Sequence, residues 1–189
     1  MKAKTKLSTI LAAISLFIST AAWTQELPKP SPTADKISIG LSAGHFRYDP
    51  GVAVEFTTKA FLQDQVSIRV KGSIQWLEAY KATYDHWATY RSFSAGLVYN
   101  GAITDRVRFY VEIGMLAIVP DVSFSDENFI EGFYEFNGLE ITIAERPNYL
   151  MTFFFGAGPA FIDATAEKIE GNPRYGNGIH YINGLRVYF

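Results

Sequence analysis

If this chain carries out chemistry that needs an imidazole, the candidates are its three histidines, His45, His86 and His180. An imidazole can move protons near neutral pH. His45 and His180 fall in segments that we expect to lie side by side, but alternation puts their side chains on opposite faces. The Gly-x-Gly at 156–158 lacks the helix that a phosphate cradle needs. No catalytic residue, metal site or cofactor is therefore predicted.

A second polar set consists of charged residues that alternate with apolar ones. If the polar face is enclosed, opposite charges on it should pair, because an isolated buried ion costs several kcal/mol. The sequence therefore predicts an interior charge network. Its members are Glu55, Lys59, Arg69, Lys71, Arg108, Glu112, Glu140 and Arg186.

The segments that must position these charges have a period of two. In segment 66–76 apolar side chains alternate with polar or charged ones, and segments 52–60 and 106–118 repeat the pattern. Such alternation is typical of strands with one apolar and one polar face. Turn residues divide the chain into eight expected strands near 36–48, 51–61, 65–78, 88–99, 105–118, 131–144, 149–165 and 178–189.

The connections alternate in length, which favours an outer-membrane barrel, with short turns in the periplasm and long loops outside. The predicted fold is all-β, an eight-stranded antiparallel up-and-down transmembrane β-barrel over residues 36–189, with both its ends in the periplasm. Asp49-Pro50-Gly51 is expected to be a short turn on the long-loop side. The other turns are Gln63-Asp64, Asn100-Gly101 and Arg146-Pro147-Asn148, and the long loops are 79–87, 119–130 and 166–177.

A soluble barrel would show the same alternation with its faces reversed, and three features favour the membrane form. The expected strands of about 10 to 14 residues exceed the ~5–6 usual in soluble sheets. Most strand glycines fall on the polar face, where a narrow interior needs small residues, although Gly72 does not. Aromatic residues mark both ends of the strands, as in membrane girdles: Tyr99, Tyr149 and Phe189 at one rim, and Tyr48, Trp76, Tyr80, Trp87 and Tyr90 at the other.

Composition narrows the class of protein further. The chain has 48% hydrophobic residues and no cysteine, so disulfides, thiolate metal sites and a cysteine nucleophile are excluded. Its 17 basic and 19 acidic residues give a net charge of −2. Without Lys2, Lys4 and Lys6 the balance would be 14 against 19, or −5, which offers no basic excess for nucleic acid.

The first residues have the pattern of a secretory signal. Lysines precede an apolar run over 7–18 that is shorter than the ~20 residues of a spanning helix. We expect a signal peptide over 1–22, cleaved after Ala22 or, alternatively, after Thr24. Prolines at every second position then predict an extended periplasmic linker over 23–35. The expected location is the outer membrane of a Gram-negative bacterium.

The last segment, 178–189, resembles the closing strand of outer-membrane proteins. It ends in Phe189, with Val187 and Leu185 at alternate positions, and in such proteins the barrel-assembly machinery recognises this pattern. Asn183 departs from the pattern because it falls on the lipid face. By architecture, residues 36–189 are similar to the small eight-stranded superfamily typified by the OmpA transmembrane domain, OmpX and OmpW.

The outer-membrane lipid A deacylases, which carry His-x-Ser-Asn on an eight-stranded barrel, offer a second comparison. The nearest match here is His180-Tyr181-Ile182-Asn183. Ile182 stands where that family has its serine, and without a hydroxyl group there is nothing for a histidine to activate. The resemblance therefore implies that this activity is absent.

The sequence favours a non-enzymatic outer-membrane barrel with a structural or surface-interaction role. An enzyme acting on envelope lipid and a narrow solute channel are the alternatives. We favour a salt-bridged interior over a pore, because side chains largely fill a lumen of eight strands. Expected partners are outer-membrane lipid and lipopolysaccharide, the assembly machinery, and a possible surface partner at loops 121–131 and 167–174.

Overall fold

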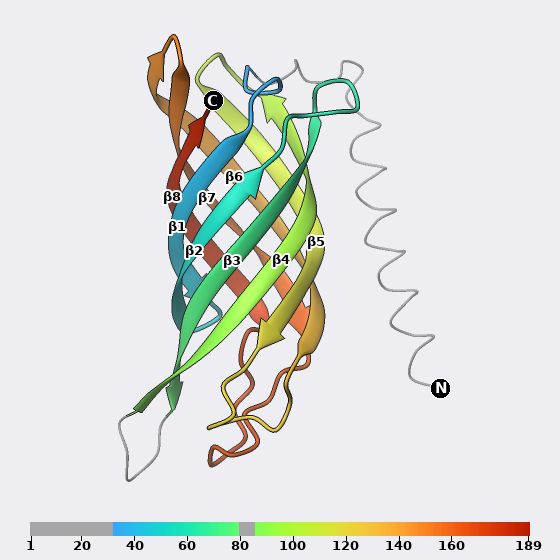
Figure 1. Cartoon of the computed structure of the whole chain (residues 1–189), viewed down its shortest axis with the longest axis vertical. Helices are drawn as coiled ribbons and strands as arrows, with labels where there is room; N and C mark the ends of the chain where they lie inside the picture. The colour runs from blue at the N-terminus through green and yellow to red at the C-terminus, as the bar shows by residue number, and fades with distance from the viewer. Residues whose placement is uncertain (1–31, 80–85) are drawn as a thin grey trace.

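The structure is a computed structural model that describes residues 32–79 and 86–189, and its strands close into one barrel (Figure 1). All neighbouring strands are antiparallel, and β1 pairs with β8 to complete the ring. The predicted fold class and strand number are confirmed. The strands are β1 (Ser38–Phe46), β2 (Asp49–Thr57), β3 (Val66–Ala79), β4 (His86–Ala102), β5 (Val107–Val119), β6 (Ile130–Arg146), β7 (Tyr149–Ile162) and β8 (Gly178–Tyr188).

The two rims differ as expected, with short turns at the end that holds the C-terminus and long loops at the other (Figure 1). Below, these are called the inner rim and the outer rim. The expected signal over 1–22 and Tyr80 lie outside the described residues. Of the expected extended linker, residues 32–35 form a turn instead, because the Lys36 amide donates to the Thr33 carbonyl and the Ala60 amide to the Ala34 carbonyl.

The turn expected at Asp49-Pro50-Gly51 is wrong by two residues. The chain reverses at Arg47 and Tyr48, and β2 already begins at Asp49. Arg47 takes the positive φ that the hairpin needs, at 66°. Pro50 is accommodated within the strand opposite His45, so the proline and glycine that suggested a turn belong to the sheet.

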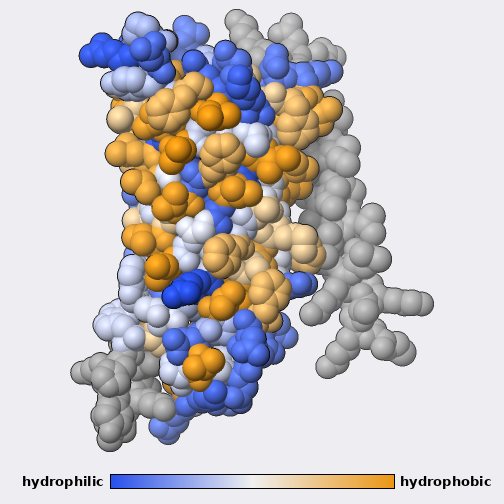
Figure 2. Space-filling model, in the orientation of Figure 1, coloured by the Kyte–Doolittle hydropathy of each residue, from blue (hydrophilic) through white to orange (hydrophobic). Residues whose placement is uncertain are grey.

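The outer wall of the barrel carries a belt of apolar side chains. Figure 2 shows this belt across the middle of one face of the molecule, with hydrophilic surface at both ends. Large apolar side chains such as Leu41, Phe93 and Phe155 are exposed on it. Within residues 32–79 and 86–189 no helix is long and apolar enough to span a membrane.

Gly72, on the apolar face, has a partner that accounts for its place. It pairs with Phe93 of β4, and a methyl group added to Gly72 would lie 3.8 Å from that ring. An aromatic residue across from a strand glycine covers the exposed backbone and stabilises the pair. Gly158 differs, because there an added Cβ would collide with the backbone carbonyl of Glu135 on β6.

We predict that most molecules of the Gly158→Ala variant fail to fold, whereas the Gly72→Ala variant folds like the wild type. The first methyl group can be accommodated only if β6 and β7 separate, and the second meets ordinary van der Waals space. The measurement is the folded fraction after refolding into detergent, read from the heat-modifiable mobility of the barrel on gels. Equal folded fractions for the two variants would contradict the prediction.

Candidate functional site

The inner half of the barrel encloses a charge cluster centred on Arg186 of β8. The Arg186 guanidinium donates through Nε to Glu55 Oε1 at 2.6 Å and through Nη1 to Glu140 Oε2 at 2.7 Å. Tyr188 also donates to Glu140 Oε2, at 3.0 Å. Three strands far apart in sequence, β2, β6 and β8, are thereby linked across the lumen.

A second group of the cluster is centred on Glu112 of β5. It accepts from Arg69 Nη1 at 2.8 Å, from Lys71 Nζ at 2.7 Å and from the Tyr134 hydroxyl at 2.6 Å. The Lys71 ammonium also lies 4.8 Å from the centre of the Phe136 ring. A carboxylate with three donors and two cations is compensated for its burial.

Arg108 of β5 completes the cluster and gives it a small positive excess. Its Nη2 lies 3.3 Å from Glu140 Oε1, which also accepts from the Thr152 hydroxyl. Four cations therefore face three anions. Apart from Lys71, the side chains of the charged members are at most 1% exposed, so the cluster excludes solvent from the lumen at this level.

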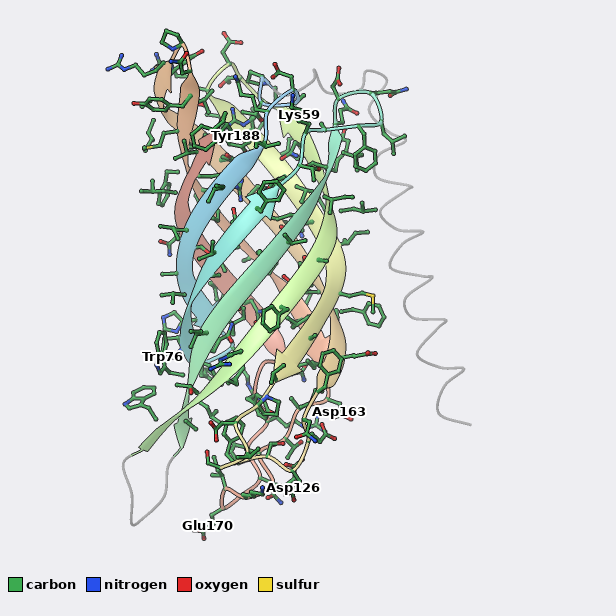
Figure 3. The ribbon with its side chains drawn as sticks, in the orientation of Figure 1. Lys59, Trp76, Asp126, Asp163, Glu170 and Tyr188 are labelled. Carbon is green, nitrogen blue, oxygen red and sulfur yellow. The ribbon has the colours of Figure 1, made fainter. Side chains whose placement is uncertain are left out.

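Seven of the eight charges assigned to the interior by alternation lie there, but Lys59 does not. β2 ends at Thr57, so alternation stops before Lys59 is reached. Lys59 is exposed at the inner rim (Figure 3). Its assignment to the network was wrong.

The outer half of the interior is mainly apolar, with Asp49, Gln75 and His180 among its buried polar side chains. The inward side chains there are buried and include Leu116, Ile118, Ile130, Ile162 and Ile182. Alternation continued from Arg108 and Glu112 puts Leu116 and Ile118 on the inner face, so the run Leu116-Ala117-Ile118, apolar on both faces, is the sequence signal for an apolar interior at this level.

Two long loops close the outer mouth and form a structure that we call the cap, made of residues 120–129 and 163–177. Phe124 and Tyr175 are fully buried where the two loops meet, with ring centres 5.3 Å apart. Tyr175 also lies 5.0 Å from the ring of Tyr90 on β4. The cap therefore extends the apolar core of the outer half instead of standing free in solvent.

Tyr90 was expected in the outer aromatic girdle, and this was wrong. Its side chain is 1% exposed and points into the barrel, where its hydroxyl donates to Asp49 Oδ2 at 2.8 Å. The Tyr175 ring of the cap packs against the Tyr90 ring inside the barrel.

Polar contacts join the two loops of the cap as well. Glu167 accepts from the Ser125 hydroxyl at 3.0 Å and from the Asp126 amide at 3.3 Å. Lys168 donates to the Val122 carbonyl and forms an ion pair with Asp126, both at 2.8 Å. Hydrogen bonds from its own backbone amide and from Ser125 lower the pKa of Glu167, and burial raises the pKa of Tyr175 to about 12.

The histidines are not brought together. His180 is buried with Nε2 2.9 Å from the Gly176 carbonyl, and its ring packs edge-on against Phe46. His45 is exposed on the outer wall, and His86 begins β4. Among the described residues no cluster of His, Asp and Glu could hold a metal ion.

The terminal strand has the orientation that alternation predicted. Leu185 and Phe189 are exposed on the outer wall, while Arg186 and Tyr188 between them are buried. Val187 shares the outer face and is half-buried. Recognition of this strand by an assembly machinery stays a prediction.

The closed ring of eight strands, the apolar outer belt and the two unequal rims define the class of protein: the chain has the fold of the small eight-stranded outer-membrane barrels. Solved structures agree with this. The N-terminal β-barrel domain of Pseudomonas aeruginosa OprF is similar with a TM-score of 0.50 and 13% identity, over 82% of this chain and 98% of that one.

Two further structures are similar at comparable identity. OprG of Pseudomonas aeruginosa has a TM-score of 0.49 and 13% identity over 85% of this chain and 98% of that one. Ail of Yersinia pestis in a nanodisc has 0.45 and 14% over 82% and 97%. No family model and no curated protein matches the sequence. The likeness is one of fold.

Proposed function

We propose that this protein is a closed, non-enzymatic outer-membrane barrel that presents the cap at the cell surface as an interaction surface. The observation that carries the proposal is the cap itself, whose loops are joined by buried rings and by an ion pair. Loops of a passive barrel need no such mutual packing, because solvent satisfies them. A rigid surface, by contrast, binds a partner with little loss of entropy.

The outward surface of the cap suggests the chemistry of its partner. Six acidic and two basic residues lie in 120–129 and 163–177, a balance of −4. Val122 and Phe129 are exposed apolar side chains, 69% and 56% accessible. A protein surface with basic and apolar groups is complementary to this combination.

The filled interior supports the closed state. A permeating solute would have to displace both the ion pairs of the inner half and the apolar core beneath the cap. In planar bilayers we expect no large, stable single-channel currents. Such currents at neutral pH would overturn the closed barrel and favour a channel.

The absence of enzymatic activity rests on the surroundings of the histidines. The position next to His180 on the inner face, where a nucleophile would have to stand, is occupied by Ile182. This side chain is buried and carries no hydroxyl group. We expect the lipid A of cells with and without the protein to have the same acyl chains. A change in acyl number would overturn this part of the proposal.

The topology can be tested by cysteine labelling, because the chain has no cysteine of its own. Glu170→Cys places a thiol on the exposed cap, and Lys59→Cys places one at the inner rim (Figure 3). We expect a membrane-impermeant maleimide to label the first variant on intact cells, and the second only after permeabilisation. The reverse pattern would overturn the surface location of the cap.

The interaction role requires its own readout. Cells displaying the wild type and cells displaying Val122→Ser with Phe129→Ser are compared for attachment to protein-coated surfaces. We expect attachment to fall to the level of cells without the protein, while surface labelling of the cap is unchanged. Equal attachment by all three kinds of cell would overturn the interaction surface.

A further inference from the structure

The apolar outer wall is interrupted on one side by polar residues. On β6 the outward side chains between Glu131 and Glu145 belong to the lipid-facing belt. Two of them, Glu135 and Asn137, are polar. On β8 the outward Asn183 is exposed. The two strands flank β7, so these polar groups lie on one face of the barrel.

Polar groups on a lipid-facing wall are costly unless they are hydrogen-bonded, because hydrocarbon offers no partners. Asn137 Nδ2 donates to Glu135 Oε1 at 2.9 Å. Within the part of the chain that the structure describes, the side-chain amide of Asn183 makes no hydrogen bond, and the carboxylate of Glu135 has no cationic partner. This face therefore lacks the partners that its polar groups need.

The strand register gives the depth of these residues relative to one another along the barrel axis. One hydrogen-bonded row starts near the inner end of β1 and ends near the outer end of β7, so each step from β1 towards β8 moves outward. The row runs through Ile39, Phe56, Val70, Ala95, Met115, Phe133 and Phe161.

Asn137 and Asn183 lie at nearly the same depth. Ala157 pairs with Asn137 on one side and Tyr181 on the other. At a strand spacing of about 4.8 Å and a tilt of about 40°, Tyr181 lies about 6 Å outward of Asn137. Asn183 is two residues further along β8, which runs towards the inner rim, so it lies about 5 Å inward of Tyr181.

This placement is self-complementary about a twofold axis along the membrane normal. Copies of an outer-membrane barrel share one orientation, so a dimer axis must have that direction. If it passes beside Ala157, Asn137 of one copy faces Asn183 of the other, since they lie on opposite sides of β7 at equal depth. Glu135 then faces Tyr181, because each is two residues further outward.

The surface around Ala157 has room for close approach. A hollow of about 550 Å³ lies over β6, β7 and β8, with the small Ala157 among its lining residues. Leu139, Phe155 and Tyr181 border it with apolar and aromatic surface. Small residues let transmembrane elements approach closely, and asparagines then form hydrogen bonds between them.

We propose that the lipid-facing wall of β6, β7 and β8 binds a second copy of this chain, with Asn137 pairing Asn183 and Glu135 accepting from Tyr181 across a twofold axis at Ala157. Each side-chain amide supplies one donor and one acceptor to its counterpart, and Glu135 gains a second donor besides Asn137. This interface lies within the membrane and is independent of the cap and its proposed partner.

The test uses single cysteines in the full-length protein in native membranes. Ala157→Cys lies on the proposed axis. Val70→Cys replaces an exposed side chain of β3, on the opposite side of the barrel. On oxidation with copper phenanthroline we expect Ala157→Cys to form a disulfide-linked dimer and Val70→Cys to stay monomeric. Heat-modifiable mobility confirms that both variants are folded.

A second pair of variants tests the asparagines. In the Ala157→Cys background, Asn137→Leu with Asn183→Leu should reduce the dimer by about five- to tenfold, from the loss of paired amides. Asn148→Leu, at the inner-rim turn, should leave it unchanged. Three results would overturn the proposal: equal cross-linking of Ala157→Cys and Val70→Cys, a product whose mass is not twice that of the chain, or a dimer that persists without both asparagines.

Discussion

Replacing Arg186 with methionine should destabilise the barrel by about 3–5 kcal/mol, the cost of leaving buried charges without their partner. Arg186 donates to Glu55 and Glu140, and all three side chains are at most 1% exposed. Methionine preserves most of the volume but offers no donor. Two buried carboxylates then lose their shared cation, and Glu55 has no other ion pair within the residues that the structure describes. Urea unfolding in lipid vesicles measures the loss.

The matched control is Arg106→Met. Arg106 lies at the inner rim and its side chain is exposed, so the same change of residue there should alter stability by less than about 0.5 kcal/mol. A double variant, Arg186→Met with Glu55→Gln, should recover part of the loss, because it also removes the stranded carboxylate, while Glu140 keeps Arg108 as its partner. If Arg186→Met and Arg106→Met unfold at the same urea concentration, the cluster does not stabilise the barrel.

The interior cluster could be predicted because side chains in a strand alternate with a period of two. Once Arg69 is placed inside, Lys71 follows, and the same holds for Arg108 and Glu112. The rule fails where a strand ends, as at Lys59. Which charges pair could not be predicted, since Arg186 meets Glu55 only through closure of β8 on β1.

The contacts in the outer half of the molecule could not be predicted from the sequence as fully as those of the inner half. Alternation correctly assigns Leu116 and Ile118 to the inner face, but it does not say what lies above them. Phe124 and Tyr175 are in loops without periodicity, 51 positions apart in the sequence, and they meet only because β5–β6 and β7–β8 end at the same rim. Tyr90 was assigned to the girdle because it is an aromatic residue near a strand end, although alternation from Phe93 and Leu97 puts it on the inner face, where it donates to Asp49.

Phe124→Asp should release the cap without unfolding the barrel. Phe124 is 1% exposed between Tyr175 and the outer core, and truncating a buried phenylalanine costs about 3–5 kcal/mol, to which a buried charge adds. That cost falls on local opening of the loops, so the open fraction rises by roughly a hundredfold or more. The measurement is the rate of trypsin cleavage after Lys168 or Arg174 on intact cells.

Phe129→Asp is the control, because Phe129 lies in the same loop and is 56% exposed. It introduces the same charge without removing a buried ring, so trypsin should cleave it at the wild-type rate. The barrel of Phe124→Asp should keep its heat-modifiable mobility, since the ion pairs of the inner half do not involve the cap. Rapid cleavage of both variants would mean that the loops are open in the native protein. Slow cleavage of both would mean that Phe124 does not hold the cap closed.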